Sequence, residues 1–212
     1  MRIGTWNLAG RWTPAHAALL EAAECDVWLL TEVDERVDLD GYLRHTTADV
    51  MSLRRRWAGV FSRTEMVPLP DPHPATAVVT VRGVTFWSSI LPWRGCRSRP
   101  PWTGERHADK TAKSVAALMA TIPSGRLVWG GDWNHALSGR EFAGSMEGRR
   151  HILAALDRLG LKVPTADLPH RIDGLLSIDH IAVGQTITIT DARRIGAAGL
   201  SDHDAYVIVT DL

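Results

Sequence analysis

The stretch that constrains this chain most covers residues 127–134, where a short apolar run leads through two glycines to an acid and an amide. The run Leu-Val-Trp is typical of a buried strand, and Gly130 and Gly131 remove side chains where another group must approach closely. If the backbone stays extended, the side chains of Asp132 and Asn134 point to the same side. A carboxylate that can take a proton from water then sits beside an amide that can hold a phosphate oxygen. Because Gly, Asp and Asn are also common in plain turns, the stretch indicates a site only if other segments contribute to it.

Polar side chains recur at four further places where a predicted strand ends or is interrupted. They are Asn7 at the end of strand 2–8, Glu32 at the end of strand 26–32, Asp179 within strand 175–183, and Asp202 with His203 just before strand 204–210. Strand 26–32 is apolar until its last residue, which fits a strand covered on both faces. In a stacked α/β fold the ends of several strands meet at one rim, where sites are assembled. The five places therefore predict one shared site.

Helical patterns alternate with these strands. Helices are predicted over residues 14–23, with Thr13 as N-cap, over about 105–121, and over 147–159, which Gly160 closes. A hairpin is predicted over 77–81 and 84–91, a strand over 57–62, and an alternating segment over 185–193. The arginine run 54–56 is expected at a solvated hairpin end. The pattern as a whole indicates an α/β fold.

Composition limits the domain count and the compartment. The chain has 212 residues, of which 45% are hydrophobic, so we expect a single domain over residues 1–212. Lys plus Arg equals Asp plus Glu at 24 each, so any anion-binding site must be local. Cys25 and Cys96 are too few for a disulfide framework, and no run is long enough to span a bilayer. We therefore expect a cytoplasmic protein with no membrane span and no evident obligate protein partner.

The loop 92–103 combines arginines with tryptophans and three prolines. It holds Trp93, Arg94, Arg97, Arg99 and Trp102. The first four of these, together with Trp133, are the candidate substrate-binding residues. Arginine offers bidentate hydrogen bonds to phosphate and tryptophan offers a surface for stacking, which suits a ligand that carries phosphate and base. An ordinary surface loop with tryptophans tucked beneath it explains the composition equally well.

The motifs, taken in their order, resemble the endonuclease/exonuclease/phosphatase superfamily, which includes apurinic endonucleases, pancreatic-type deoxyribonuclease, sphingomyelinases and inositol polyphosphate phosphatases. They are Thr5-Trp6-Asn7, Thr31-Glu32, Gly131-Asp132-Trp133-Asn134, Ile178-Asp179-His180 and Ser201-Asp202-His203. No single motif is specific, but the ordered set is, and it covers nearly the whole chain. The resemblance implies a four-layer α/β/β/α sandwich, in which two packed mixed sheets are flanked by helices.

The resemblance also implies a metal site. Asn7 and Glu32 are expected to bind a divalent cation, with Glu32 as the main ligand and Asp202 helping through water. Oxygen ligands of this kind suit Mg²⁺ or Mn²⁺ rather than zinc.

Four further residues are implied to be catalytic. Asp132 is expected to position or deprotonate the attacking water, and Asn134 to hold the phosphate. His203, oriented by Asp179, is expected to bind a phosphoryl oxygen or to share in acid–base work. Whether Asp132 or His203 is the base stays open. Because Asp179 and its neighbour His180 face opposite ways in an extended strand, His180 is expected in the core or on the back face.

One segment departs from the family pattern. The family commonly has Asn-Thr-His-Leu, or a tyrosine in place of the histidine, where this chain has Ser88-Ser89-Ile90-Leu91. A hydrogen-bonding side chain that contacts phosphate is thus replaced by Ile90. Just downstream, Arg94, Arg97 or Arg99 is expected to supply the missing donor.

The expected function is a divalent-metal-dependent phosphoester hydrolase, in the first place a nuclease-like phosphodiesterase. The short chain and neutral charge argue against strong duplex binding, so single-stranded or distorted nucleic acid is the expected polymer substrate. Candidate stacking surfaces are Trp12, Trp93, Trp102 and Trp133. One alternative is a phosphomonoesterase or phosphodiesterase acting on a small or lipid-like phosphoester. An alternative of another class, motivated by Ile90, is a catalytically silent binding module on the same fold.

Overall fold

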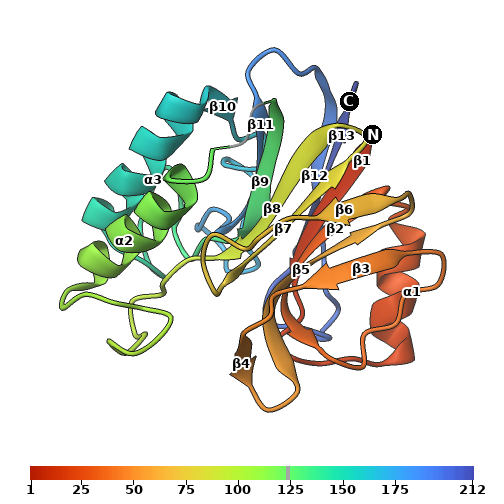
Figure 1. Ribbon diagram of the computed structural model, residues 1–212, viewed down its shortest axis with the longest axis horizontal. Coiled ribbons are helices and arrows are strands. Elements are labelled where there is room, and N and C mark those ends of the chain that lie inside the picture. Colours follow the sequence, from red (N-terminus) through yellow and green to blue (C-terminus); the bar gives the residue numbers. More distant parts are fainter. Residues whose placement is uncertain (123–124) are drawn as a thin grey trace.

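Two mixed β-sheets pack face to face in the computed structural model, which describes residues 1–122 and 125–212, and helices lie outside them (Figure 1). The first sheet has the order β12 (Ile189–Ile195), β13 (Ala205–Thr210), β1 (Arg2–Asn7), β2 (Val27–Asp34), β5 (Arg55–Ser62) and β3 (Leu43–Thr46), with β4 (Val50–Ser52) also on β5. The second has the order β10 (Leu161–Lys162), β11 (Asp179–Gly184), β9 (Arg126–Asp132), β8 (Val84–Ile90), β7 (Thr76–Val81) and β6 (Met66–Pro68). The helices are α1 (Pro14–Ala22), α2 (His107–Met119) and α3 (Met146–Leu159).

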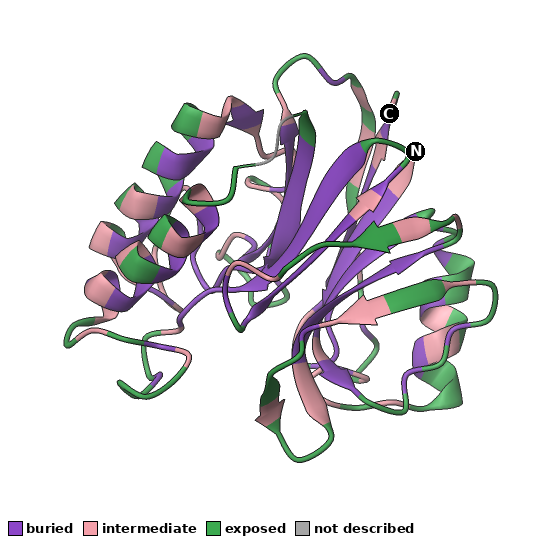
Figure 2. Ribbon diagram, viewed as in Figure 1, coloured by how far each residue is buried: buried purple, intermediate pink, exposed green. Residues whose placement is uncertain are grey.

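Three apolar clusters hold these layers together. Between the sheets, Leu29 of the first sheet belongs to the same buried cluster as Phe86 and Val128 of the second. Leu20 of α1 is buried with the outer face of the first sheet, and a third cluster joins α2 and α3 to the outer face of the second sheet. The strands are accordingly buried along most of their length, whereas each helix exposes one side (Figure 2). The predicted four-layer sandwich is confirmed.

Glycines at the end of β9 allow the close contacts that the sequence predicts there. A Cβ on Gly130 would lie 2.6 Å from Leu29 Cδ1 of the facing sheet and 2.7 Å from the carbonyl oxygen of His180. Gly131 has a φ of +124°, and a Cβ there would lie 2.1 Å from Ser89 O on β8. Both positions therefore require glycine, and they bring the two sheets and three neighbouring strands together just before Asp132.

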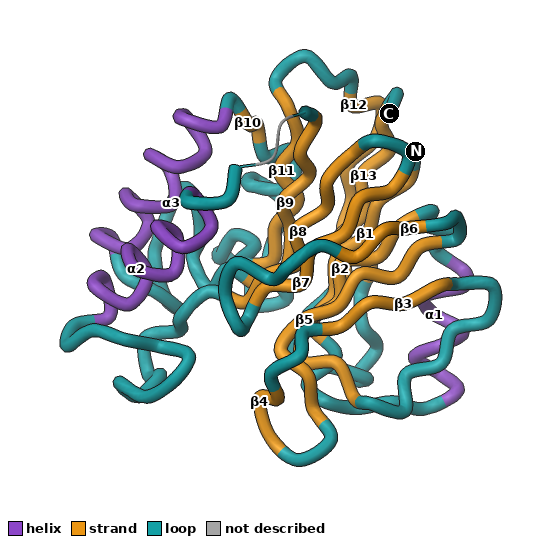
Figure 3. The backbone as a smooth tube through the Cα atoms, viewed as in Figure 1, coloured by secondary structure: helices purple, strands orange, loops and turns teal. Residues whose placement is uncertain are grey.

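The strand directions bring the ends of β1, β2, β8 and β9 and the beginnings of β11 and β13 to one rim (Figure 3). β1 runs parallel to β2, and β8 runs parallel to β9. β13 runs antiparallel to β1 and β11 antiparallel to β9, so these two strands begin at the rim where β1 and β9 end. This arrangement places the residues after β1 and β9 next to those before β11 and β13.

Some predicted element bounds are wrong. The second helix is shorter than 105–121, and the segment 185–193 becomes a strand only from Ile189 onward. The strand predicted over 175–183 starts at Asp179, because the preceding residues pair with another segment. The amide of Ser177 donates to Leu168 O, and Pro169 forms a bridge with Leu176. None of the helices in the described part of the chain is long and apolar enough to cross a membrane.

Candidate active site

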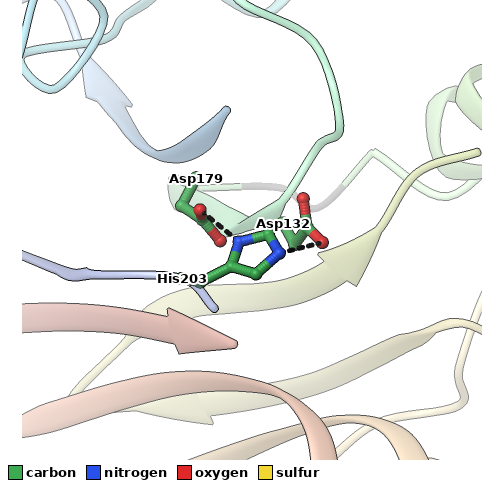
Figure 4. A group of neighbouring side chains, drawn as sticks. All are labelled: Asp132, Asp179 and His203. Atoms are coloured by element: carbon green, nitrogen blue, oxygen red, sulfur yellow. Dashed lines mark hydrogen bonds and ion pairs between the residues drawn. The ribbon is translucent and has the colours of Figure 1, made fainter. Parts of the chain in front are cut away.

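Two carboxylates and one imidazole form the centre of the rim (Figure 4). Asp132, the last residue of β9, and Asp179, the first of β11, are direct partners in the register of the two strands. The ring of His203 lies between them, with Nδ1 2.8 Å from Asp179 Oδ2 and Nε2 3.9 Å from Asp132 Oδ2. Both aspartates are buried, at 2% and 1% exposure. A single histidine thus bridges two buried acids.

The pKa values of this group follow from burial and from the opposite charges. Burial acts to lower the pKa of His203, but the carboxylates of Asp179 and Asp132 outweigh it and raise that pKa to about 10. Burial also raises the pKa of Asp132 to about 7, although the neighbouring His203 opposes this rise. The arrangement therefore favours a protonated His203 beside a carboxyl group that can exchange a proton near neutral pH.

The loop that carries His203 is fixed to the end of β1. The hydroxyl of Ser201 donates to the carbonyl oxygen of Asn7 at 2.6 Å and accepts the amide of His203 at 3.1 Å. The indole Nε1 of Trp6 donates to His203 O at 2.9 Å. These three bonds hold His203 against the first sheet, while Asp179 orients its ring from the second. Ser201 belongs to the predicted motif Ser201-Asp202-His203, but the sequence did not indicate that its hydroxyl holds the His203 loop to β1.

Asn7 and Glu32 lie on the other side of Asp132. The amide Nδ2 of Asn7 donates to Asp132 Oδ2 at 2.9 Å and to Glu32 Oε1 at 3.3 Å, and its Oδ1 accepts the amide of Ala9 at 2.8 Å. Glu32 is not the last residue of its strand, since β2 continues to Asp34. Its φ of +49° is rare for a residue with a side chain and is the kind of strain found at functional sites.

Asn134 corrects the expectation of an extended backbone after β9. Its φ is +52°, its amide donates to Asp132 Oδ1 at 3.0 Å, and its side-chain Nδ2 donates to Leu91 O at 3.1 Å. Residues 132–134 therefore form a turn, as one of the two interpretations of the sequence expected. The turn also brings Asn134 back beside Asp132, as the other interpretation, a shared site, requires. The side chain of Asn134 is 8% exposed.

The described residues fit a hard divalent cation on the Glu32 side of the cluster. One ligand atom each from Asp132, Asp179 and His203 lie within 4.8 Å of one another, and Asp179 Oδ1 is buried without a hydrogen-bond partner. Both ring nitrogens of His203 face carboxylates, however, which favours the imidazolium form, and an imidazolium has no lone pair for a metal. Glu32 and Asp132 instead offer carboxylate oxygens, which suit Mg²⁺ or Mn²⁺. Asn7 offers an oxygen to the same cation only if its amide turns, because its Oδ1 accepts the amide of Ala9 and its Nδ2 faces the carboxylates. Asp202 is exposed and is not part of the acid–histidine cluster.

A cavity of about 350 Å³ opens above these groups. It is lined by Glu32, Met51, Ile90, Trp93, Arg94, Gly95, Asp132, Asn134, Ala143 and His203. Ile90 is the register partner of Asp132 on β8, so the position at which the family commonly has a hydrogen-bonding side chain lies directly beside Asp132. Of the three candidate arginines, only Arg94 lines this cavity.

Arg55 was missed in the sequence. The run 54–56 does form a hairpin end, where Arg54 has a φ of +57°, but Arg55 turns inward and its Nη1 lies 2.7 Å from Glu32 Oε2. Arg55 fits there because Gly10 is opposite, where a Cβ would lie 2.0 Å from the guanidinium Nε. A run of three arginines gave no sign that one of them pairs with the predicted metal ligand.

Sequence comparison decides the family. The profile described as the endonuclease/exonuclease/phosphatase family matches residues 4–203. The chain belongs to that family. Members of the endonuclease/exonuclease/phosphatase family are hydrolases of phosphoester bonds, and its nucleases generally use divalent metals. Among curated proteins, no sequence match is found.

Solved structures agree with the family fold at low sequence identity. The endonuclease domain of TRAS1, a telomere-specific non-LTR retrotransposon, superposes with a TM-score of 0.72 at 14% identity, covering 98% of this chain and 96% of that domain. The AP endonuclease LMAP from Leishmania major gives 0.67 at 16% identity, with 98% and 86% covered. A humanized D. rerio TDP2 gives 0.62 at 17% identity, with 100% and 99% covered. At these identities the likeness establishes the fold.

Two of the tryptophans predicted as stacking surfaces are too deeply buried to stack on a base. Trp133 is fully buried and packs against Trp129, with ring centroids 4.3 Å apart. Trp102 is 2% exposed and lies edge-on to Trp57. Because neither ring presents a free face, neither can stack on a base, and the placement of Trp133 in the substrate-binding set is wrong. Trp93 is partly exposed and lines the cavity above Asp132.

Proposed function

We propose that this chain is a Mg²⁺- or Mn²⁺-dependent phosphodiesterase of the nuclease kind. The observation that carries the proposal is the array of Asp179, His203 and Asp132, which continues through Asn7 to Glu32. Three members of this array, Asp132, His203 and Glu32, line the cavity. Burying a carboxylate costs free energy of folding unless it is paired, and groups with perturbed pKa values cluster at functional sites. A silent binding module has no chemical need for this array, which argues against that alternative.

The proton and charge chemistry follows from these side chains. Glu32 and Asn7 would hold the divalent cation, which when bound supplies positive charge for the phosphoryl oxygens and lowers the pKa of water. Asp132, with its raised pKa, accepts a proton from the attacking water. Protonated His203 donates through Nε2 to a phosphoryl oxygen and stabilises the charge that develops there. This arrangement favours Asp132 over His203 as the base.

Two neighbouring groups position the reactants. Asp179 accepts the Nδ1 proton of His203, which fixes the ring so that Nε2 points toward Asp132 Oδ2, 3.9 Å away. The amide of Asn134 lies at the cavity edge within reach of a phosphate oxygen. Arg94, whose Nε is held by Gly144 O at 2.8 Å, offers a cationic group on the side where Ile90 provides none. These residues bind and orient the phosphate without exchanging a proton with it.

A diester is favoured over a monoester because the cavity continues into a second one. Met51, Trp93 and Gly95 line both the cavity above Asp132 and a larger neighbouring cavity. A phosphomonoester has a single organic group, whereas a diester has two, and the second cavity offers room for the second group. A small or lipid-like phosphoester is the alternative that this observation favours less.

An activity panel with purified protein tests the proposal. The substrates are single-stranded DNA, RNA, an aryl phosphodiester and inositol phosphates, each with Mn²⁺ and with EDTA. We expect diester hydrolysis that EDTA abolishes and that Glu32→Gln and Asp132→Asn each lower by about 10²- to 10⁴-fold. The matched control is Asp157→Asn on the exposed side of α3, which leaves the rate unchanged. Inactivity on every substrate, or activity indifferent to EDTA, refutes the proposal.

We also propose that residues 1–212 work as one domain in a reducing compartment such as the cytoplasm. Both sheets contribute to the same cavity, since Glu32 comes from the first and Asp132 from the second. Cys25 and Cys96 are free and buried, which is consistent with a reducing environment.

A further inference from the structure

A second cavity of about 550 Å³ adjoins the one above Asp132. Its walls come from the β4–β5 hairpin on one side and from the loop 93–102 on the other. Its volume lies within the range of pockets that hold a small organic group. The two cavities share Met51, Trp93 and Gly95. A substrate whose phosphate lies above Asp132 can therefore extend directly into the second cavity.

The chemistry of the second cavity is cationic and aromatic. Arg55, Arg97 and Arg99 line it, and none of the described residues that line it is acidic. Arg55 is neutralised by Glu32, whereas Arg97 and Arg99 are exposed and have no ion-pair partner among the described residues. Two uncompensated guanidinium groups beside one cavity are suited to bind phosphate through bidentate hydrogen bonds.

Three tryptophans form one wall of the second cavity. Trp102 contacts both Trp57 and Trp93 edge-on, with ring centroids 5.3 Å and 6.2 Å apart. Trp57 and Trp102 are buried, so Trp93 is the member of this wall that is open to a ligand. The indole Nε1 of Trp102 is buried and has no hydrogen-bond acceptor among the described residues. A buried donor of this kind costs free energy, because it has lost its hydrogen bond to water.

The loop that carries these residues is held in place before any ligand binds. Lys110 of α2 is 5% exposed, and its Nζ donates to Cys96 O at 2.6 Å. The amide of Trp102 donates to Arg99 O at 2.8 Å, and the hydroxyl of Ser98 donates to Gly104 O at 2.6 Å. A preorganised loop loses little conformational entropy on binding.

We propose that the second cavity binds the unpaired nucleotide next to the scissile phosphate, with its base stacked on Trp93 and its own phosphate bound by Arg97 and Arg99. This inference rests on the proposed phosphodiesterase function and narrows its substrate to single-stranded nucleic acid. A base stacked on Trp93 cannot remain paired within a duplex. The neutral net charge of the chain agrees, because binding then depends on this local site rather than on a general attraction to polyanions.

Binding is tested without turnover, in EDTA, by fluorescence anisotropy with labelled oligothymidylate, oligouridylate and a duplex of equal length. We expect the wild type to bind single strands more tightly than the duplex; the comparison of the first two probes shows whether DNA or RNA is preferred. Trp93→Ala should weaken single-strand binding about 5- to 100-fold, as loss of one stacking partner does. Arg97→Gln/Arg99→Gln should reduce the slope of log affinity against log salt by about 0.7 for each phosphate contact removed.

The matched control is Arg150→Gln/Arg158→Gln, which removes two exposed arginines of α3 and changes the net charge equally. Its affinity and salt slope should equal those of the wild type. Unchanged affinity in both Trp93→Ala and Arg97→Gln/Arg99→Gln, or equal binding of duplex and single strands, overturns the inference.

A kinetic comparison separates this inference from the proposed function. The measured quantity is the ratio of kcat/KM on the oligonucleotide to kcat/KM on an aryl phosphodiester, which has no second phosphate. We expect this ratio to fall at least tenfold in Arg97→Gln/Arg99→Gln and to stay within twofold in Arg150→Gln/Arg158→Gln. If the wild type hydrolyses both substrates and the ratio does not fall, the nucleotide site is refuted and the hydrolase stands. If the wild type hydrolyses neither, the hydrolase fails, and the anisotropy experiment alone decides the nucleotide site.

Discussion

A buried ion pair between Glu141 and Arg149 supports the loop beside the cavity above Asp132. The two side chains are 3% and 7% exposed, and Arg149 Nη2 lies 3.3 Å from Glu141 Oε2. Glu141 Oε1 also accepts the backbone amides of Phe142 at 2.9 Å and Gly144 at 2.8 Å. The carbonyl oxygens of this loop in turn hold Arg94, so Glu141 fixes the loop that places Arg94 at the cavity.

The substitution Glu141→Ala should lower stability because it leaves the buried guanidinium of Arg149 without its carboxylate partner. The guanidinium of Arg149 keeps a hydrogen bond to Gly139 O at 3.0 Å, but its charge is buried without a counterion, and its Nε has no partner. Removing one member of a buried ion pair costs about 3–5 kcal/mol. The two amides near Glu141 are only partly buried, so water can replace part of their lost bonds. We therefore expect the free energy of unfolding to fall by about 3–5 kcal/mol.

Urea denaturation followed by tryptophan fluorescence measures this change. The double variant Glu141→Gln/Arg149→Met leaves no buried charge, so it should be at least about 1 kcal/mol more stable than Glu141→Ala. The control is Glu24→Ala, which removes a 75% exposed partner of Arg2 and should change stability by less than about 0.5 kcal/mol. The reasoning is refuted if Glu141→Ala costs less than about 1 kcal/mol, or if the double variant is the least stable of the three.

Three further predictions concern charge at the site and in the core. Asp179→Asn should lower kcat by about 10²- to 10⁴-fold; because the Asp179 carboxylate raises the pKa of His203, the variant's activity should also be lost at lower pH on the alkaline side of its pH–rate profile, and an unchanged alkaline limb contradicts this. Arg55→Ala should tighten Mn²⁺ binding about tenfold in calorimetric titration, since the guanidinium competes with the metal for Glu32, and an equal Kd contradicts it. Burial lowers the pKa of His73 to about 4, that of His135 to about 3 and that of His180 to about 4. The unfolded chain therefore binds protons below pH 6.5 that the folded chain does not. Stability is therefore fully present above pH 6.5 and falls as the pH drops toward 4, by about 2 kcal/mol per histidine at pH 5, and urea midpoints that do not change between pH 7 and 5 contradict this.

The layers and the rim could be predicted because they depend on local patterns. Strand 26–32 reads as apolar on both faces, and the structure buries it between α1 and the second sheet. Family membership was predicted from the ordered motifs and is confirmed by the family profile. His180, expected away from the site, is fully buried and bonds through Nε2 to His135 O. The periodicity of the chain carries the information for the strand and for His180, whereas the family follows from the resemblance of the ordered motifs.

What could not be predicted depends on contacts between distant segments. Glu32 and Arg55 meet only because β2 and β5 are neighbours, and no local pattern in the arginine run shows this. The motif Gly131-Asp132-Trp133-Asn134 suggested that Trp133 faces the site. The backbone turns after Asp132, however, and that turn sends the indole into the core against Trp129. The same residue types, Gly, Asp and Asn, occur in turns and at strand ends. The two structures expose different side chains, so the sequence alone did not show that Trp133 is buried.

The position of β1 in the middle of the first sheet has a consequence for synthesis of the chain. β1 leaves the ribosome well before β13, yet part of its hydrogen bonds go to β13, where Arg2 pairs with Val209. At about 5–20 residues per second, β1 waits roughly 10–40 s for that partner. Until then the edge of β1 that later pairs with β13 has no partner strand, and an unpaired edge can pair with strands of other chains. His203 is translated just before β13, so Asp132 is synthesised well before the acid–histidine cluster can be completed.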